Sequence, residues 1–125
     1  MYRYFAYRLP ANMKYAYSEG ASADDLKTLQ SSAIDSDTTS LYHTLNQLYT
    51  GDKSTLSYAV YNDENPDGTT TSGGMHGKGA IATDKTSGFW LIQSLPKYPD
   101  MTSEADAWSK SAPNFGQHCS FFFCF

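Results

Sequence analysis

The chain has 125 residues, of which 40% are hydrophobic and 15% aromatic, and this fits one domain with one core rather than a disordered chain. No apolar run approaches the roughly 20 residues that a membrane helix needs. The formal charge of −4 at pH 7 lacks the excess of Lys and Arg that favours nucleic-acid binding at neutral pH, although carboxylates and the three His gain protons in an acidic compartment.

Two short strands are predicted near the N-terminus. Tyr2–Leu9 places aromatic residues among basic and small ones and ends at Pro10, a pattern typical of a strand. Met13–Tyr17 predicts a second strand before the turn at Gly20. One or two helical turns are then expected over Ala23–Gln30.

The clearest predicted helix runs from about Thr38 to Tyr49. Asp37 can cap its N-terminus, and Gly51 follows it as a stop signal. Leucines recur within it at the spacing of one helix face, and they predict a buried stripe. They are Leu41, Leu45 and Leu48.

Three further strands are predicted in the second half. Leu56–Tyr61 alternates apolar and polar residues and is followed by a polar loop over Asn62–Gly74. Met75–Thr83 and Phe89–Ser94 are predicted as two strands that a turn at Asp84–Gly88 joins.

The last strand is predicted over His118–Phe125, after an irregular stretch over Thr102–Gly116. No internal repeat or linker divides the chain, so residues 1–125 are expected to form a single domain. Strands with an intervening helix predict an α+β fold that has a mixed sheet and flanking helices.

The N-terminus and the cysteines bear on the cellular compartment. Met1–Phe5 has no apolar stretch and no cleavage site, so no signal peptide is expected in this chain. If the segment between Cys119 and Cys124 is extended, their Cα atoms lie about 16 Å apart, whereas a disulfide tolerates less than about 7 Å. They are not expected to bond each other. Either they are buried thiols, or one has a partner outside this chain.

One segment combines residue types that suit a phosphodiester. His76 and Lys78 are two residues apart, so on a strand they would project from the same face, and Gly77 and Gly79 would permit close approach of another element or ligand. An imidazole can attack phosphorus or shuttle a proton, while an ammonium neutralises the charge on the phosphate oxygens. Asp84 could orient a ring nitrogen or simply cap the turn.

No metal or cofactor is expected. The acidic residues of the polar loop lack the ligand pattern of a calcium-binding loop. His118 and Cys119 are adjacent, so on a strand they would face opposite sides, which is poor geometry for a shared metal. The acidic residues concerned are Asp63, Glu64 and Asp67.

Two other features have simpler interpretations. His43 lies near Asn46 and Gln47 on the predicted helix and is expected to face solvent. Phe89 and Trp90 precede Leu91–Ile92 and are interpreted as core residues rather than as a base-stacking platform.

Several segments, in order and approximate spacing over nearly the whole chain, together resemble the N-terminal half of the deoxyribonuclease II family. Each is weak alone, and the combination in register is specific. The segments are Tyr7-Arg8-Leu9-Pro10, Leu48-Tyr49, Tyr61-Asn62-Asp63, His76-Gly77-Lys78-Gly79 followed by Asp84, Gly88-Phe89-Trp90-Leu91-Ile92, Ser94-Leu95-Pro96 and Phe115-Gly116-Gln117.

This resemblance implies a phospholipase D-like architecture, in which two similar halves each contribute a His-x-Lys element to one site. It implies metal-independent cleavage of DNA at acid pH through a phosphohistidine, in a lysosomal or secreted protein. His76 would be the catalytic His of this half, Lys78 its phosphate-binding partner, and Asp84 and Gln93 supporting residues. One His must be neutral while the other is protonated, which is easiest near pH 5 to 6, within about a unit of the ordinary imidazole pKa of about 6.5.

The chain departs from the family pattern in ways that leave three interpretations open. The 125 residues contain no second His-x-Lys element, the family commonly has His where Gln93 stands, and its Cys lies four residues beyond the Gln that corresponds to Gln117. In the first interpretation, the chain is a nuclease that needs a second half, which is either a C-terminal segment or a symmetry mate. Alternatively, it is an inactive secreted or lysosomal binding protein, or a truncated fragment.

Overall fold

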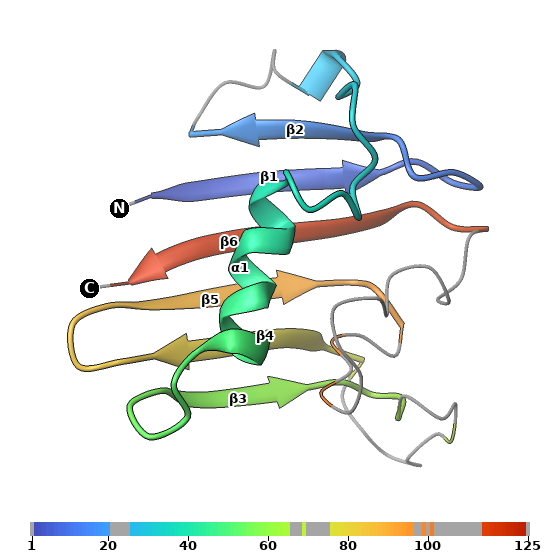
Figure 1. The fold of residues 1–125 in the computed structure, drawn as a ribbon. Coiled ribbons are helices and arrows are strands. Elements are labelled where there is room, and N and C mark those ends of the chain that lie inside the picture. The colour runs from blue at the N-terminus through green and yellow to red at the C-terminus, as the bar shows by residue number, and fades with distance from the viewer. Residues whose placement is uncertain are drawn as a thin grey trace.

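The computed structural model describes residues 2–20, 26–65, 69, 76–96, 99, 101 and 114–124 of the chain. Over these residues, six antiparallel strands form one sheet in the order β2-β1-β6-β5-β4-β3, and a single α-helix, α1, crosses one face (Figure 1). The elements are β1 (Arg3–Arg8), β2 (Tyr15–Glu19), α1 (Ser40–Thr50), β3 (Ser57–Tyr61), β4 (Lys78–Thr83), β5 (Gly88–Gln93) and β6 (Gln117–Cys124).

The fold is α+β, as predicted, but its sheet is antiparallel rather than mixed. The turn between β4 and β5 is too short for the crossover that a parallel pair requires, so the two strands form a hairpin. Strands from the two ends of the chain also meet, because β1 pairs with β6 in the middle of the sheet. Within the described residues one helix, rather than several, flanks the sheet.

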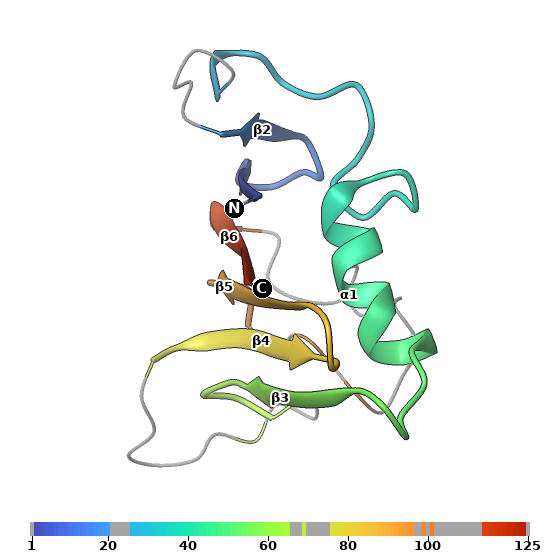
Figure 2. The same ribbon diagram turned by 90° about the vertical axis from the view of Figure 1, so that its left-hand side faces the viewer.

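Helix α1 joins opposite edges of the sheet. The chain leaves β2 at one edge and enters β3 at the other, so α1 runs across the strands rather than along them (Figures 1 and 2). Thr39, not the predicted Asp37, caps it: the Thr39 hydroxyl accepts a hydrogen bond from the backbone N–H of Tyr42 at 3.1 Å. Gly51 follows the last helical residue, as predicted.

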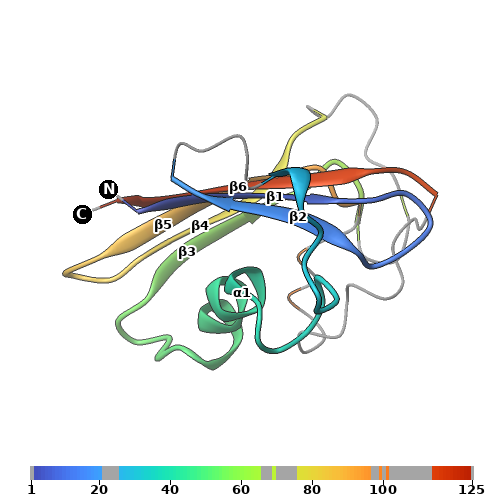
Figure 3. The same cartoon turned by 90° about the horizontal axis from the view of Figure 1, so that it is seen from above.

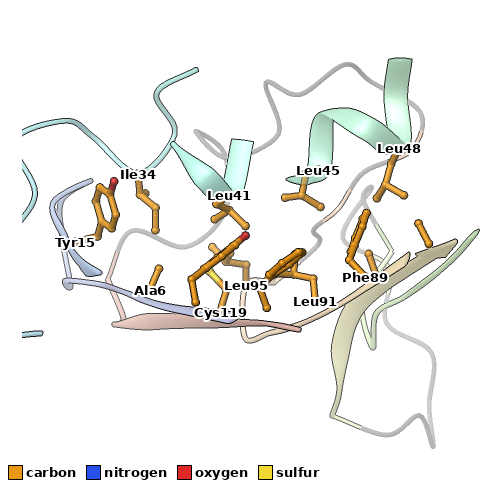
Figure 4. Close-up of a cluster of buried hydrophobic side chains, with 14 residues drawn as sticks. Ala6, Tyr15, Ile34, Leu41, Leu45, Leu48, Phe89, Leu91, Leu95 and Cys119 are labelled. Carbon is orange, nitrogen blue, oxygen red and sulfur yellow. The ribbon is translucent and has the colours of Figure 1, made fainter. Parts of the chain in front are cut away.

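The core lies between α1 and the sheet, as the view from above shows (Figure 3). The three predicted leucines of α1 are buried and point at the sheet, and Phe89, Leu91 and Cys119 meet them from β5 and β6 (Figure 4). Burial alternates along β1 and β5, so one face of each of these two strands contributes to this core. We call the opposite side of the sheet the far face.

Most of the predicted strands exist with shifted ends. The second strand begins at Tyr15 instead of Met13. The helical turns expected over Ala23–Gln30 fall partly on residues 23–25, which lie outside the described residues. Leu26 and Lys27 have 3₁₀-helical conformation, and Leu29 forms an isolated antiparallel bridge with Ala16. Neither the loop after Asn65 nor the stretch over Thr102–Gly116 is described in full.

Cys119 is a buried thiol that forms no disulfide. Burial raises the pKa of this thiol to about 12, so it is inert as a nucleophile and serves as a core residue.

The helix that the structure describes has 11 residues, and no helix of the described residues combines the length and apolar character of a membrane span.

Candidate active site

A pocket of about 440 Å³ opens at one end of the sheet, which is the right-hand end in Figure 1. Neighbouring strands run in opposite directions, so this end brings together the end of β3, the start of β4, the end of β5 and the start of β6. We call it the strand-end pocket. Its lining residues are Tyr61, His76, Gly77, Lys78, Trp90, Ile92, Gln93, Ser94 and His118.

His76 and Lys78 are held together by one carboxylate. His76 Nε2 lies 3.2 Å from Oδ2 of Asp63, and Lys78 Nζ lies 2.5 Å from Oδ1 of the same group. Asp63 follows β3 by two residues, so the pairing of β3 with β4 places it next to the start of β4. The structure therefore brings the two predicted residues together through a third, which the sequence analysis had treated only as a loop acid.

The reason given for this proximity from the sequence was wrong. The predicted strand over Met75–Thr83 begins only at Lys78, and His76 lies in a bend before it. Tyr61, which pairs with Gly79, is the last residue of β3, so no partner strand extends far enough to pair with His76. The proximity of His76 and Lys78 depends on the Asp63 carboxylate and not on the alternation of side chains along a strand.

The three side chains differ sharply in exposure. The His76 side chain is 93% exposed, whereas that of Lys78 is 4% and that of Asp63 16% exposed. The hydrogen bond from Lys78, together with the charges of Lys78 and His76, outweighs partial burial and lowers the pKa of the Asp63 carboxyl below its ordinary value of 3.8. Asp63 therefore stays ionised in a mildly acidic medium and can keep its contacts with Lys78 and His76.

This pairing predicts a pH-dependent stability difference between the protein and its Asp63→Asn variant. The folded-state pKa of Asp63 lies below its unfolded value, so its stabilisation is complete above about pH 4 and is lost as pH falls through the folded pKa. We expect Asp63→Asn to have a lower free energy of unfolding near neutral pH, because it leaves the buried Lys78 ammonium without its counter-charge. Urea titrations along a pH series measure the difference, which should shrink at the acid end; a difference that is constant with pH would contradict the ion pair.

The two predicted supporting residues are placed differently. Gln93 lines the strand-end pocket, and its buried side-chain oxygen accepts a hydrogen bond from the backbone N–H of Leu95. Asp84 lies at the opposite end of β4, where its Oδ1 accepts hydrogen bonds from Thr86 and Ser87 of the hairpin turn. Of the two roles considered for Asp84, it has that of capping the turn, and it does not reach the imidazole.

His118 is a second imidazole of the strand-end pocket. Its backbone N–H donates to Ser94 Oγ, and its carbonyl accepts from the Ser94 N–H, each at 3.0 Å, so the backbone of β6 is fixed against the end of β5 here. As expected for adjacent strand residues, His118 is exposed on the far face while Cys119 is buried in the core. His43, as predicted, is exposed on α1.

Trp90 is not a core residue, contrary to the sequence interpretation. Phe89 and Leu91 point into the core, and the alternation of the strand places Trp90 between them on the far face, where it is 43% exposed. Its indole N–H donates to the Tyr61 hydroxyl at 3.0 Å. Both rings line the strand-end pocket.

Sequence reasoning missed two residues that line this pocket, Tyr61 and His118, and it missed Asp63, which contacts His76 and Lys78. The motif Tyr61-Asn62-Asp63 was noted only as a similarity, and His118 only as a poor metal ligand. Alternation along β3 and β6, taken with the strand order, would have placed Tyr61 and His118 on the same face. Within the described part of the chain, no group of three or more His, Cys, Asp or Glu residues could hold a metal ion.

Comparisons with known proteins agree with the family resemblance found in the sequence. A family profile described as Deoxyribonuclease II matches residues 3–125. Plancitoxin-1 from Acanthaster planci is 36% identical over 90 residues, which cover 70% of this chain and 25% of that protein. Cell death-related nuclease 6 from Caenorhabditis elegans is 39% identical over 72 residues, covering 57% and 19% respectively. Deoxyribonuclease-2-alpha from Bos taurus is 30% identical over 128 residues, covering 91% and 34%, so the chain spans between about a fifth and a third of these relatives' lengths.

Proposed function

The chain belongs to the deoxyribonuclease II family, and from this premise we propose that it contributes one half of an acid endonuclease that hydrolyses DNA phosphodiesters without a metal. The observation that carries the proposal is the convergence of His76 and Lys78 on the Asp63 carboxylate at the strand-end pocket. It supplies a nucleophile, a cation for the phosphate and a group that orients both.

Asp63 has a specific part in this chemistry. In this proposal His76 Nε2, which lies 3.2 Å from Asp63 Oδ2, carries the hydrogen and donates it to the carboxylate, so the Nδ1 lone pair is available to attack phosphorus. Attack forms the phosphohistidine and breaks the bond from phosphorus to the 5′-oxygen of the next nucleotide, which leaves with a proton. Water then cleaves the phosphohistidine to give a 3′-phosphate end.

Lys78 stabilises the negative charge on the non-bridging oxygens of the phosphate as the nucleophile attacks. An ammonium has three N–H donors, so contact with Asp63 leaves others for the non-bridging oxygens of a phosphate in the pocket. The low exposure of Lys78 strengthens this interaction, because little water screens it. Gln93 forms part of the pocket wall, and its amide does not exchange a proton near pH 5.

The proton for the leaving oxygen comes, in this proposal, from the His of a second His-x-Lys half in a phospholipase D-like arrangement. That half is either a C-terminal segment or a second copy of this chain. Mildly acid conditions, as in a lysosome or a secretory compartment, keep one imidazole protonated and reduce the repulsion between a chain of formal charge −4 and DNA.

A second candidate is an inactive protein that binds DNA or another anion with the same pocket. Gln93 favours it, because an amide stands where the family commonly has an imidazole that can exchange a proton. The two candidates differ in whether DNA that is bound is also cut.

The proposal predicts DNA cleavage at about pH 5 that is insensitive to chelators and leaves 3′-phosphate ends. A 5′-labelled oligonucleotide is incubated with the protein over a wide concentration series, with and without EDTA, and the products are treated with a phosphatase that shifts 3′-phosphate ends. A rate per chain that rises with protein concentration would identify a second copy as the missing half. Cleavage abolished by EDTA, or products with 3′-hydroxyl ends, would overturn the mechanism, and binding without cleavage would support the second candidate.

A further inference from the structure

The stability of the fold does not explain why the indole of Trp90 is exposed. Burial of a tryptophan side chain stabilises the folded state, yet Trp90 remains 43% exposed between two buried residues of β5. Large aromatic side chains exposed in a pocket commonly mark a binding site.

The indole is held in one orientation. Its N–H donates to the Tyr61 hydroxyl at 3.0 Å, and Tyr61 in turn lies over Gly79, where an added Cβ would collide with the Tyr61 hydroxyl. The bare backbone of Gly79 thus lets the Tyr61 ring approach the sheet and accept this hydrogen bond. A ring fixed before binding loses little conformational entropy when a ligand stacks on it.

The same pocket combines this aromatic wall with cationic and imidazole groups. Tyr61, Trp90 and Ile92 form the apolar part, while His76, Lys78 and His118 supply groups that suit a phosphate. The volume of about 440 Å³ lies within the range of roughly 300–1,000 Å³ typical of small-ligand pockets. An aromatic surface next to a phosphate site fits the two chemical parts of one nucleotide.

We infer that Trp90, supported by Tyr61, forms a nucleobase subsite, so that the strand-end pocket takes a nucleotide whose base is unstacked. In duplex DNA both faces of a base are covered by its neighbours, so a base that stacks on Trp90 must come from a single strand or leave the helix. The inference rests on the proposed function for the identity of the phosphate group and adds which part of the strand the pocket selects.

Binding to two oligonucleotides of equal charge tests the subsite, and all proteins in this test carry His76→Ala so that neither oligonucleotide is cleaved. One is a short single-stranded oligo(dA), and the other has the same phosphates with abasic sugars. At about pH 5 with EDTA, we expect the oligonucleotide with bases to bind the protein about tenfold more tightly, because stacking on an aromatic ring contributes this much per base. Trp90→Ala should remove the difference, and Trp90→Phe should keep most of it.

Tyr58→Ala is the matched control. Tyr58 is 44% exposed, close to the value for Trp90, but it pairs with Ala82 on β4 and lies away from the strand-end pocket. This variant should preserve the preference for bases, and circular dichroism should show all three variants folded. A preference that survives Trp90→Ala, or failure of the protein to bind either oligonucleotide, would overturn the inference, as would a change confined to self-association in size-exclusion chromatography.

The outcomes separate this inference from the proposed function. If the base preference is present and lost in Trp90→Ala while no DNA is cut, the subsite stands and the nuclease mechanism fails. If DNA is cut through His76 but both oligonucleotides bind equally, the mechanism stands and the subsite fails.

Discussion

Replacing His76 by alanine should reduce DNA cleavage at about pH 5 by a factor of about 10³ or more, because a nucleophile has no substitute within its own step. His76 is the exposed imidazole whose Nε2 Asp63 holds, and its removal leaves Lys78 and Asp63 paired. The rate of appearance of 3′-phosphate ends in the presence of EDTA measures the effect.

His43→Ala is the control for this substitution. His43 is also an exposed His, but it lies on α1 against the ring of Tyr42, away from the pocket. It should keep full activity, and both variants should unfold at the parent temperature, since His76 is 93% exposed and contributes little to packing. Cleavage at the parent rate by His76→Ala would remove this residue from the chemistry.

Gly79→Ala should have the largest effect on stability, lowering the free energy of unfolding by about 3 kcal/mol or more. An added Cβ would overlap the backbone oxygen of Leu91 and the hydroxyl of Tyr61. Because the Leu91 oxygen belongs to the backbone of β5, relief requires β4 and β5 to separate, whereas a flexible side chain could move aside. Urea unfolding followed by circular dichroism measures the loss.

Gly20→Ala separates steric overlap from the general cost of replacing a glycine. At Gly20 φ is +88°, so alanine is strained, but an added Cβ meets nothing within 4 Å. Its loss should stay near the cost of about 1–2 kcal/mol for a side chain in the left-handed region. Equal losses of unfolding free energy in the two variants would show that Tyr61 and Leu91 do not obstruct a Cβ atom at position 79.

Local patterns predicted the elements well where burial follows a simple period. The leucines of α1 recur at helical spacing and the residues of β1 alternate in type, while β5 and β6 were predicted from their apolar runs; all four elements exist close to their predicted ranges. The ends were less certain, because the last residues of a strand depend on whether a partner strand reaches them. The start of β4 at Lys78 is such a case, since β3 ends opposite Gly79.

The cap of α1 shows the same limit at the scale of a single turn. Asp37 and Thr39 are both good capping residues, and the sequence offers no reason to prefer either. The structure uses Thr39, whose hydroxyl hydrogen is also shared between the carbonyls of Ser36 at 2.9 Å and Ile34 at 3.1 Å. A second interaction, formed only in the folded chain, decided between them.

The sequence by itself determined the α+β class, the helix, most of the strands, the family and the two residues His76 and Lys78 that meet at the site, since these depend on residues close together along the chain. Only the tertiary structure decided that Asp63 joins that pair, that His118 faces the same pocket and that Trp90 is exposed beside Tyr61. The physical reason is that each of these contacts joins different segments, so it depends on strand order and register, which no local period encodes.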